Sequence, residues 1–418
     1  MAHLNVERKR RLKVYLVAIL VLCSLFILTA CNPNGDAINM ANQKSVGEPT
    51  HFIAKFLIIL NNGIGDFGWT VVVFTIILKL ITTPFDFWQK HIMRKNAKIM
   101  ERLKPQLDAL AEKCGDDKQR YQQEQMAMYK REKYSTLGAC IPTIITLVVF
   151  FIVFAGFRQM VSYENALVYQ SARNTYYAEH DNEYAAAMEA ELKTLGLTDE
   201  QIASVLVIER DGDTIKSIKI NPTELTAEQK IAIEGCDARS EAKAKDLAQS
   251  AVLKNYKRPK FLWIWNIFSQ DSWVYAVPDY TTFSGQSGMS GAKIEGVMVT
   301  EYETVMGKVL GTGGYGKDGK WNGLLIFPLL SIGLNILSQL MMQKAQGKQP
   351  KAQAGQASSK MMQWIMPVMM GVFALLYSAA FTIYIFTSTL YSILFQLLFN
   401  LFAKVADKNK ERKLGIRR

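Results

Sequence analysis

The sequence of 418 residues contains few cysteines, and no two of them have the spacing of a metal site or of a redox pair. We therefore expect no zinc site, no disulfide framework and no cofactor. The long apolar segments contain no histidine and only one acid, Asp86, near an end. An intramembrane hydrolase needs a nucleophile with a base, or paired carboxylates, so the sequence disfavours that class and we expect no enzyme chemistry. The five cysteines are Cys23, Cys31, Cys114, Cys140 and Cys236.

Charge and hydrophobicity are unevenly distributed along the chain. The formal net charge is +12 and hydrophobic residues make up 49% of the sequence, but apolar runs alternate with charged stretches. A positive charge of this size suits nucleic acid or an anionic membrane surface. The basic clusters flank the apolar runs, which favours the membrane.

The first 30 residues resemble a secretory signal peptide. A charged segment at 7–13 precedes an apolar segment at 14–28, and the run ends in Leu28-Thr29-Ala30-Cys31. This ending resembles the lipobox of bacterial lipoproteins, in which cleavage precedes the cysteine and its sulfur carries lipid, including palmitate. The thiolate is the nucleophile that forms the thioether. We expect a signal peptide at 1–30 and lipid on Cys31; the alternative is an uncleaved signal anchor.

Five later segments are long and apolar enough to cross a bilayer, since about 30 Å of hydrocarbon requires about 20 helical residues. The expected fold class is an all-α membrane bundle with five transmembrane helices. The predicted spans are 69–87, 138–157, 323–342, 361–377 and 380–402, and only Ser378-Ala379 separates the last two.

Loop charge predicts the orientation of these spans. Segment 344–360 has four lysines and no acid, and the tail 404–418 has seven basic residues against two acids. The sequence therefore predicts that the basic loop 343–360 and the tail 403–418 are cytoplasmic. It also predicts a cytoplasmic helical hairpin at 88–137 and an outer segment at 158–322. We expect a multi-pass protein of the plasma membrane, with a lipid-anchored N-terminus outside and the C-terminus in the cytoplasm.

The segments between the spans contain recognisable local signals. In the outer segment 31–68, residues 52–60 predict an interfacial helix followed by a Gly-rich turn at 61–68. Thr198 and Thr226 each begin a capping box, and Asp211-Gly212 between two β-rich runs predicts a hairpin. These signals predict an inserted small α+β domain outside the membrane. Residues 284–319 are rich in Gly and Ser and predict a flexible linker; a phosphate loop at 311–316 is disfavoured because no Lys-Ser/Thr follows.

Lys79 is the most informative residue, because it lies about 15 Å into the first predicted span, near the middle of the bilayer. A lysine there costs roughly 3 kcal/mol, and such cations are functional by default. Polar residues at helical spacing predict a hydrated cavity that faces the bundle interior. Any one hydroxyl can instead bond its own backbone, and Ser, Asn or Gln can join helices. The candidate groove residues are Lys79, Thr75, Thr82, Thr83, Thr146, Asn335, Ser338, Tyr384, Ser388 and Ser392.

Several motifs, taken in order, resemble the YidC-type membrane protein insertases. Thr75-Ile76-Ile77-Leu78-Lys79-Leu80-Ile81-Thr82-Thr83-Pro84 is similar to the family's first-span signature, with a basic residue shortly before a proline. Residues 98–107 resemble the start of the family's cytoplasmic hairpin. Residues 128–130 and 137–142 resemble its end, and 261–278 resemble the segment before the third span. The chain departs from the pattern at Lys79, where the family has arginine; at Thr146, where it often has glutamine; and through an insertion at about 163–257.

The resemblance implies a helical bundle with a hydrophilic groove in which Lys79 corresponds to the family's cation. It implies that the chain moves hydrophobic segments of nascent membrane proteins from the cytoplasm into the lipid bilayer. Expected partners are these nascent proteins, the bilayer, the ribosome through the basic hairpin and tail, and the Sec translocon. The alternative is a polytopic transporter or channel with an intramembrane lysine. That class typically has repeat symmetry and broken helices, which are not evident in the sequence.

Overall fold

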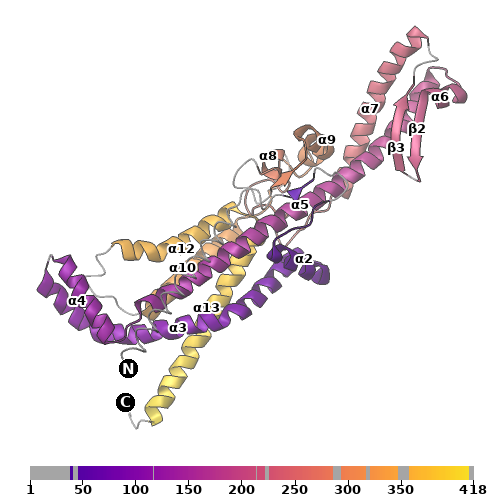
Figure 1. Cartoon of the computed structure of the whole chain (residues 1–418). Helices are drawn as coiled ribbons and strands as arrows, with labels where there is room; N and C mark the ends of the chain where they lie inside the picture. The colour runs from indigo at the N-terminus through magenta and orange to yellow at the C-terminus, as the bar shows by residue number, and fades with distance from the viewer. Residues whose placement is uncertain are drawn as a thin grey trace, which may run out of the picture.

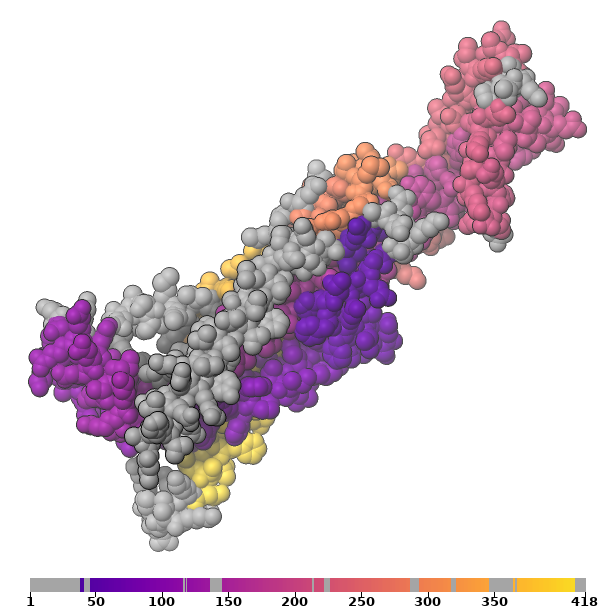
Figure 2. All heavy atoms as spheres, viewed as in Figure 1, coloured from indigo at the N-terminus to yellow at the C-terminus, as the bar shows by residue number. Residues whose placement is uncertain are grey.

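The computed structural model describes residues 38–40, 46–115, 117–212, 214–221, 226–285, 293–316, 321–346 and 357–413. The predicted signal peptide and Cys31 lie outside this part. The described chain is mostly helical and elongated, with a helical hairpin at one end and a helical arm at the other (Figures 1 and 2).

Four described helices are long and apolar enough to cross a membrane. They are α3 (Phe67–Cys114), α5 (Thr136–Thr194), α10 (Ile326–Gln346) and α13 (Ala379–Lys413). A fifth helix, α12 (Ala357–Leu376), contributes a shorter apolar stretch at Pro367–Leu376. The helical membrane bundle expected from the sequence is therefore present, while its count of five spans stays a prediction.

Helix α2 (Phe52–Ile64) precedes α3 and corresponds to the predicted interfacial helix. It continues through Asn61–Ile64, so the Gly-rich turn predicted at 61–68 is too long. The turn centres on Gly65, whose φ of 78° is readily available only to glycine. Asp66 then caps α3 by accepting a hydrogen bond from the Trp69 N–H at 2.9 Å.

Aromatic side chains hold the bundle together along the part of α5 where the sequence predicts the second span. Phe150 and Phe157 of α5 each lie 5.6 Å, between ring centroids, from Phe381 of α13. All three are almost fully buried. Such contacts add to the effect of burial because the edge of one ring packs on the face of another. This cluster fixes α5 against α13 and so determines one boundary of the cavity described below.

The hairpin consists of the second half of α3 and α4 (Lys118–Arg131), within the segment 88–137 where the sequence predicts a helical hairpin. Leu103 and Leu107 are buried against Tyr121 and Tyr129 of α4. Asn96 closes the base, because its amide donates to the Ser135 carbonyl at 2.8 Å and its oxygen accepts from the Ser135 N–H at 3.2 Å.

At the other end, α5 continues without interruption past its apolar part, so the span predicted at 138–157 is the first part of a longer helix. It packs along α7 (Ala227–Asn255) to form the arm (Figure 1). The tip contains α6 (Asp199–Val205) and the antiparallel pair β2 (Leu206–Asp211) and β3 (Thr214–Ile220). Both predicted capping boxes, at Thr198 and Thr226, are confirmed.

The flexible linker predicted at 284–319 is wrong for the part that the structure describes. This part contains β4 (Ile294–Glu295), which pairs in parallel with β1 (Ile38–Asn39), and α9 (Val299–Leu310). Helix α9 buries Tyr302, Val305, Met306 and Val309, which recur at helical spacing. The glycines after α9 wrap its C-terminus, where the Tyr315 and Gly316 N–H groups donate to the Val309 carbonyl. No phosphate loop is formed by residues 311–316.

The segment from Tyr256 to the short helix α8 (Tyr280–Phe283) joins several helix ends. Asp271 is buried and accepts hydrogen bonds from the N–H groups of Leu324, Leu325 and Phe327 at 2.9–3.2 Å, which caps α10. The Ala379 and Ala380 N–H groups at the start of α13 donate to the Ser269 and Ile267 carbonyls, each at 2.8 Å. This segment therefore holds the ends of α10 and α13 together.

Candidate functional site

The polar residues of α3 occupy one face because they recur at three- and four-residue spacing. Three hydroxyls are held locally. The Thr75 Oγ1 donates to the Val71 carbonyl at 2.6 Å, and the Thr82 and Thr83 hydroxyls donate to the Lys79 carbonyl at 3.2 and 2.7 Å. These bonds satisfy the hydroxyl protons inside apolar surroundings, and each hydroxyl oxygen keeps accepting capacity.

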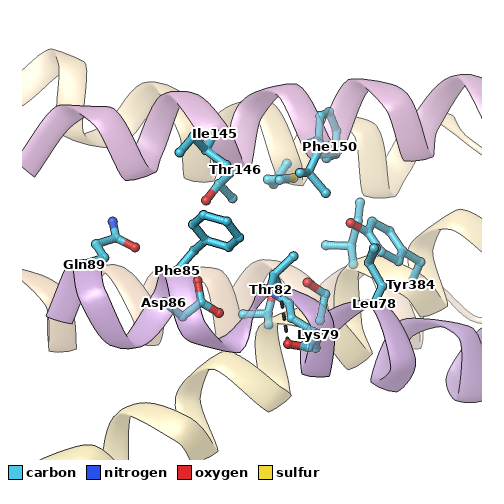
Figure 3. Close-up of a pocket in the computed structure, with 15 residues that line it drawn as sticks. Leu78, Lys79, Thr82, Phe85, Asp86, Gln89, Ile145, Thr146, Phe150 and Tyr384 are labelled. Carbon is cyan, nitrogen blue, oxygen red and sulfur yellow. Dashed lines mark hydrogen bonds between the residues drawn. The ribbon is translucent and has the colours of Figure 1, made fainter. Parts of the chain in front are cut away.

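A cavity lies between α3, α5, α12 and α13. In Figure 3 the side chain of Thr146 points from α5 toward α3, opposite Phe85. Phe85 lines the cavity and is also 52% exposed, so the cavity reaches the surface of the helix bundle. Its lining residues are Leu78, Lys79, Thr82, Phe85, Asp86, Gln89, Ile145, Thr146, Val149, Phe150, Met370, Tyr384, Ile385, Ser388 and Thr389.

Lys79 links the cavity to the contact between α3 and α13. Its Nζ donates to the Ser392 Oγ at 3.1 Å, and the Ser392 hydroxyl in turn donates to the Ser388 carbonyl at 2.9 Å. One turn further along α3, the Thr83 and Tyr391 hydroxyls lie 2.7 Å apart. The lysine is thus positioned by a hydroxyl rather than by a carboxylate, so its charge is not neutralised by a direct ion pair among the described residues.

Five of the ten predicted groove residues line the cavity: Lys79, Thr82, Thr146, Tyr384 and Ser388. Thr83 and Ser392 lie beside it in the α3–α13 contact, whereas Thr75 is fully buried. Asn335 does not line the cavity itself, but its Oδ1 accepts a hydrogen bond at 3.4 Å from Thr389, which does. Ser338 does not line the cavity. Cys31, the predicted lipidation site, lies outside the described residues.

Sequence reasoning missed several lining residues. Asp86 has the spacing of the polar face of α3 but was not predicted as a groove residue, and Gln89 continues the same face three residues later. Thr389 directly follows Ser388 on α13, whereas the predicted groove residues Tyr384, Ser388 and Ser392 recur every four residues. The helical spacing on α3 could have identified Gln89, whereas Met370 becomes evident only when α12 is packed against the bundle.

Further cations follow the same side of α3 beyond the cavity. Lys90 donates to Gln396 and lies over the Phe395 ring, 5.7 Å from its centroid. Arg94 forms an ion pair with Asp407, to which Lys98 also donates at 3.3 Å. The Arg94 and Asp407 side chains are 31% and 44% exposed, so their pair adds little to stability. The row of charges extends from the cavity toward the hairpin end.

The cavity can accommodate polar groups within an apolar bundle, because hydroxyls, an amide and both signs of charge face it. The described residues contain no cluster of three or more metal-ligating side chains. The lining supplies a cation and hydrogen-bonding groups for a polar segment.

The sequence model of the family described as "60Kd inner membrane protein" matches residues 59–208 and 247–407, more than half of the chain. The match is interrupted within the arm, in the segment expected to be an insertion. Its two parts cover α3, α5 and α10, α13 as far as residue 407, and every residue that lines the cavity.

Similar curated proteins carry the name "Membrane protein insertase YidC". The protein of Pseudoalteromonas atlantica is 36% identical over 99 residues, or 24% of this chain and 18% of the relative. That of Paracoccus denitrificans is 35% identical over 99 residues, covering 24% and 15% of the two chains. That of Ectopseudomonas mendocina is 37% identical over 92 residues, covering 22% and 15%.

The aligned region is thus less than a fifth of the length of each of these relatives. Their names favour the insertase expectation over a transporter or channel. The resemblance to YidC-type proteins is confirmed, and the chain belongs to the 60Kd inner membrane protein family.

Proposed function

We propose that this chain is a membrane protein insertase that moves hydrophobic segments of nascent proteins from the cytoplasm into the lipid bilayer. The observation that carries the proposal is the position of Lys79, a cation beside a polar cavity between otherwise apolar helices. A lysine inside a membrane is costly, at roughly 3 kcal/mol or more, and is usually kept for function. The names of the matched relatives support the same activity.

In this proposal the cavity is a hydrophilic groove that lowers the cost of moving a polar tail part-way across the membrane. Hydroxyls of Thr82, Thr146 and Ser388 replace some of the hydrogen bonds that the tail loses with water. Lys79 attracts an acidic tail. The hydrophobic segment then leaves sideways past Phe85 into lipid, driven by burial of its apolar surface. No covalent bond changes.

The loop charges support the direction of this movement. We infer that the α3–α4 hairpin and the basic tail face the cytoplasm and that the arm lies outside. The hairpin and tail can receive a nascent chain, or the ribosome through phosphate contacts, and the Sec translocon is a further candidate partner. We also propose that residues 1–30 are removed and that Cys31 carries lipid, which would hold the mature N-terminus at the outer face.

The test is insertion by the purified protein in liposomes, with a short single-span substrate that has an acidic outer tail. Wild type is compared with Lys79→Arg and Lys79→Leu. We expect Arg to support insertion and Leu to reduce it at least about tenfold, because removing the charge withdraws more than about 1.4 kcal/mol of attraction. Lys55→Leu is the control, since Lys55 of α2 is an exposed lysine that does not line the cavity and lies outside the hairpin and the tail.

Each outcome separates the activity from the assigned role of the cation. Equal insertion by wild type and Lys79→Leu would contradict the electrostatic role and retain the insertase. Absence of insertion by folded wild-type protein, in liposomes where a YidC relative is active, would contradict the proposed activity itself. A loss in Lys55→Leu equal to that in Lys79→Leu would show that general charge, and not the cavity, determines the effect.

A further inference from the structure

Large apolar side chains are exposed in the irregular segments that lead into α10. Leu262 is 66% exposed, Trp273 63%, Trp321 58% and Leu324 57%. We name these four residues the aromatic collar. The two tryptophan rings lie 6.0 Å apart, and a β-bridge joins Tyr275 to Trp321, so segments distant in sequence form one surface. Exposed apolar patches of this kind mark interaction sites.

The collar lies at the level where the long apolar helices begin. Leu324 precedes the first residue of α10 by two positions. Phe261, next to Leu262, lies 5.7 Å from the ring of Trp69 near the start of α3, and a side chain in place of Gly68 would collide with it. Trp69 itself is 55% exposed. Tryptophans at the ends of spans sit at the boundary between headgroups and acyl chains, so the collar is continuous with the membrane surface.

Two cations, Arg258 and Lys260, precede Leu262 of this collar in the chain, and both lie over the ring of Trp265. The Arg258 guanidinium lies 4.8 Å from the centroid of the Trp265 ring and 3.5 Å from that of Tyr315, and the Lys260 Nζ lies 4.6 Å from the centroid of Trp265. Among the described residues no carboxylate pairs with either cation within 4 Å. The backbone position of Trp265 is fixed, because its N–H donates to the Asn322 carbonyl next to Trp321.

The surroundings of Arg258 favour a bound anion. Its Nη1 is buried and has no hydrogen-bond partner in the described part of the chain. Burial also lowers the pKa of the guanidinium below its usual range. The aromatic rings cover the faces of the guanidinium but cannot accept the hydrogen bonds that it donates in its own plane. An anion in that plane would supply these acceptors and reduce the repulsion between the two cations.

We propose that Arg258 and Lys260 bind the headgroup phosphate of an anionic phospholipid while the aromatic collar enters the adjacent acyl region. The pairing of a phosphate-binding fork with exposed tryptophan and leucine side chains fits an amphipathic ligand. A free phosphate would leave the collar exposed to water. Arginine suits the phosphate because its planar fork can donate two parallel hydrogen bonds. This site is separate from the cavity and does not depend on the insertase activity.

The experiment measures lipid retained by the detergent-solubilised full chain in native mass spectrometry. The protein is titrated with phosphatidylglycerol, with phosphatidylcholine of the same acyl chains, and with inorganic phosphate as competitor. We expect preferential retention of phosphatidylglycerol, and a loss of about thirtyfold in apparent affinity for Arg258→Gln/Lys260→Gln if each charge contributes as basic residues do at anionic surfaces. Lys245→Gln, which removes an exposed charge from α7, should bind as wild type.

Lys260→Gln alone keeps the test independent of folding, because Lys260 is exposed. It should lose about fivefold, with unchanged helix content by circular dichroism. Trp273→Ala/Trp321→Ala should weaken retention of both lipids while keeping the preference for phosphatidylglycerol. Equal retention of the two lipids by wild type, or an unchanged preference in Lys260→Gln, would overturn the proposal. Displacement of the lipid by low millimolar phosphate would overturn it in favour of a free-anion site.

Discussion

The Nζ of Lys79 donates a 3.1 Å hydrogen bond to the Oγ of Ser392, across 313 residues of sequence and from α3 to α13. The charge that the sequence places in the middle of the first span is therefore held by a neutral acceptor on another helix. A neutral acceptor satisfies one of the three ammonium protons without cancelling the charge. The two residues should consequently be coupled energetically.

Ser392→Ala should lower the stability of the protein by about 1 kcal/mol, because the half-buried Lys79 ammonium loses an acceptor. In a Lys79→Leu background the same substitution should have almost no effect, which gives a coupling energy of about 1 kcal/mol. Thermal unfolding in detergent, followed over the four-variant cycle, measures the coupling. Ser338→Ala on α10 is the matched control and should not couple to Lys79. Additive effects of Ser392→Ala and Lys79→Leu would contradict the bond.

Asp271→Ala should destabilise the protein by about 3 kcal/mol, because three N–H groups at the start of α10, of which the Phe327 N–H is buried, lose their acceptor. Asp271→Asn should cost less, since an amide oxygen still accepts. Asp279→Ala is the comparison, because Asp279 caps only the four-residue α8 and should cost about 1 kcal/mol. Thermal unfolding in detergent ranks the three variants. Equal losses for Asp271→Ala and Asp279→Ala would contradict the special role of Asp271.

The local elements were predictable where a short-range signal determines them. The capping boxes at Thr198 and Thr226 and the turn at Asp211-Gly212 depend on neighbours within a few residues, and the structure contains them. Helix α9 was missed although Tyr302, Val305, Met306 and Val309 have helical spacing. Its flanks are rich in Gly and Ser, and their composition outweighed a pattern of only 12 residues.

The sequence predicted which residues of a single helix share the face that forms the site, but it did not predict how the helices pack together. Spacing places Lys79 and Thr82 on one face of α3, and both line the cavity. Spacing does not determine how each helix is rotated against the others, so Ser338 was included and Thr389 was missed. The rotation depends on packing between helices, for example of Phe150 against Phe381, and that information is not local in the sequence.

His180 should make the stability of the arm depend on pH. Its ring nitrogens lie 3.2 Å from Asp181 on α5 and 3.1 Å from Glu241 on α7. The hydrogen bond to Asp181 is the main reason why its pKa is raised, with a further contribution from Glu241, and burial opposes the rise. Tyr176 and Tyr184 stack on the ring, and Tyr184 donates to Asp237. About 50 Å of helix separates His180 from Ile145, which lies within the span predicted at 138–157. This distance exceeds the hydrocarbon thickness of about 30 Å, so His180 lies outside that span.

A raised pKa means that the folded arm binds the proton more tightly than the unfolded chain. The stabilisation is fully present below about pH 6.5, the ordinary value for histidine, and is lost as pH rises through the folded value. Compared with His180→Gln, wild type should therefore become less stable between about pH 6 and pH 8. Thermal unfolding at several pH values measures this difference, with His91→Gln, an exposed histidine of α3, as control. Parallel pH profiles for wild type and His180→Gln would rule out the contribution.

Gly156→Ala should separate α2 from α5. A Cβ at Gly156 would lie 2.4 Å from the Cβ of Ile53 and 3.0 Å from the Nδ1 of His51, which caps α2. Atoms so close must move apart, and overpacking of this kind costs about 1–3 kcal/mol, more than the gain of up to about 1 kcal/mol from replacing a helical glycine.

Gly333→Ala on α10 meets no atom within 4 Å, so only that gain remains and the variant should be slightly more stable than wild type. Thermal unfolding in detergent compares the two substitutions, and faster hydrogen exchange in α2 should accompany Gly156→Ala alone. If both variants were stabilised equally, the close packing of α2 on α5 at Gly156 would be disproved.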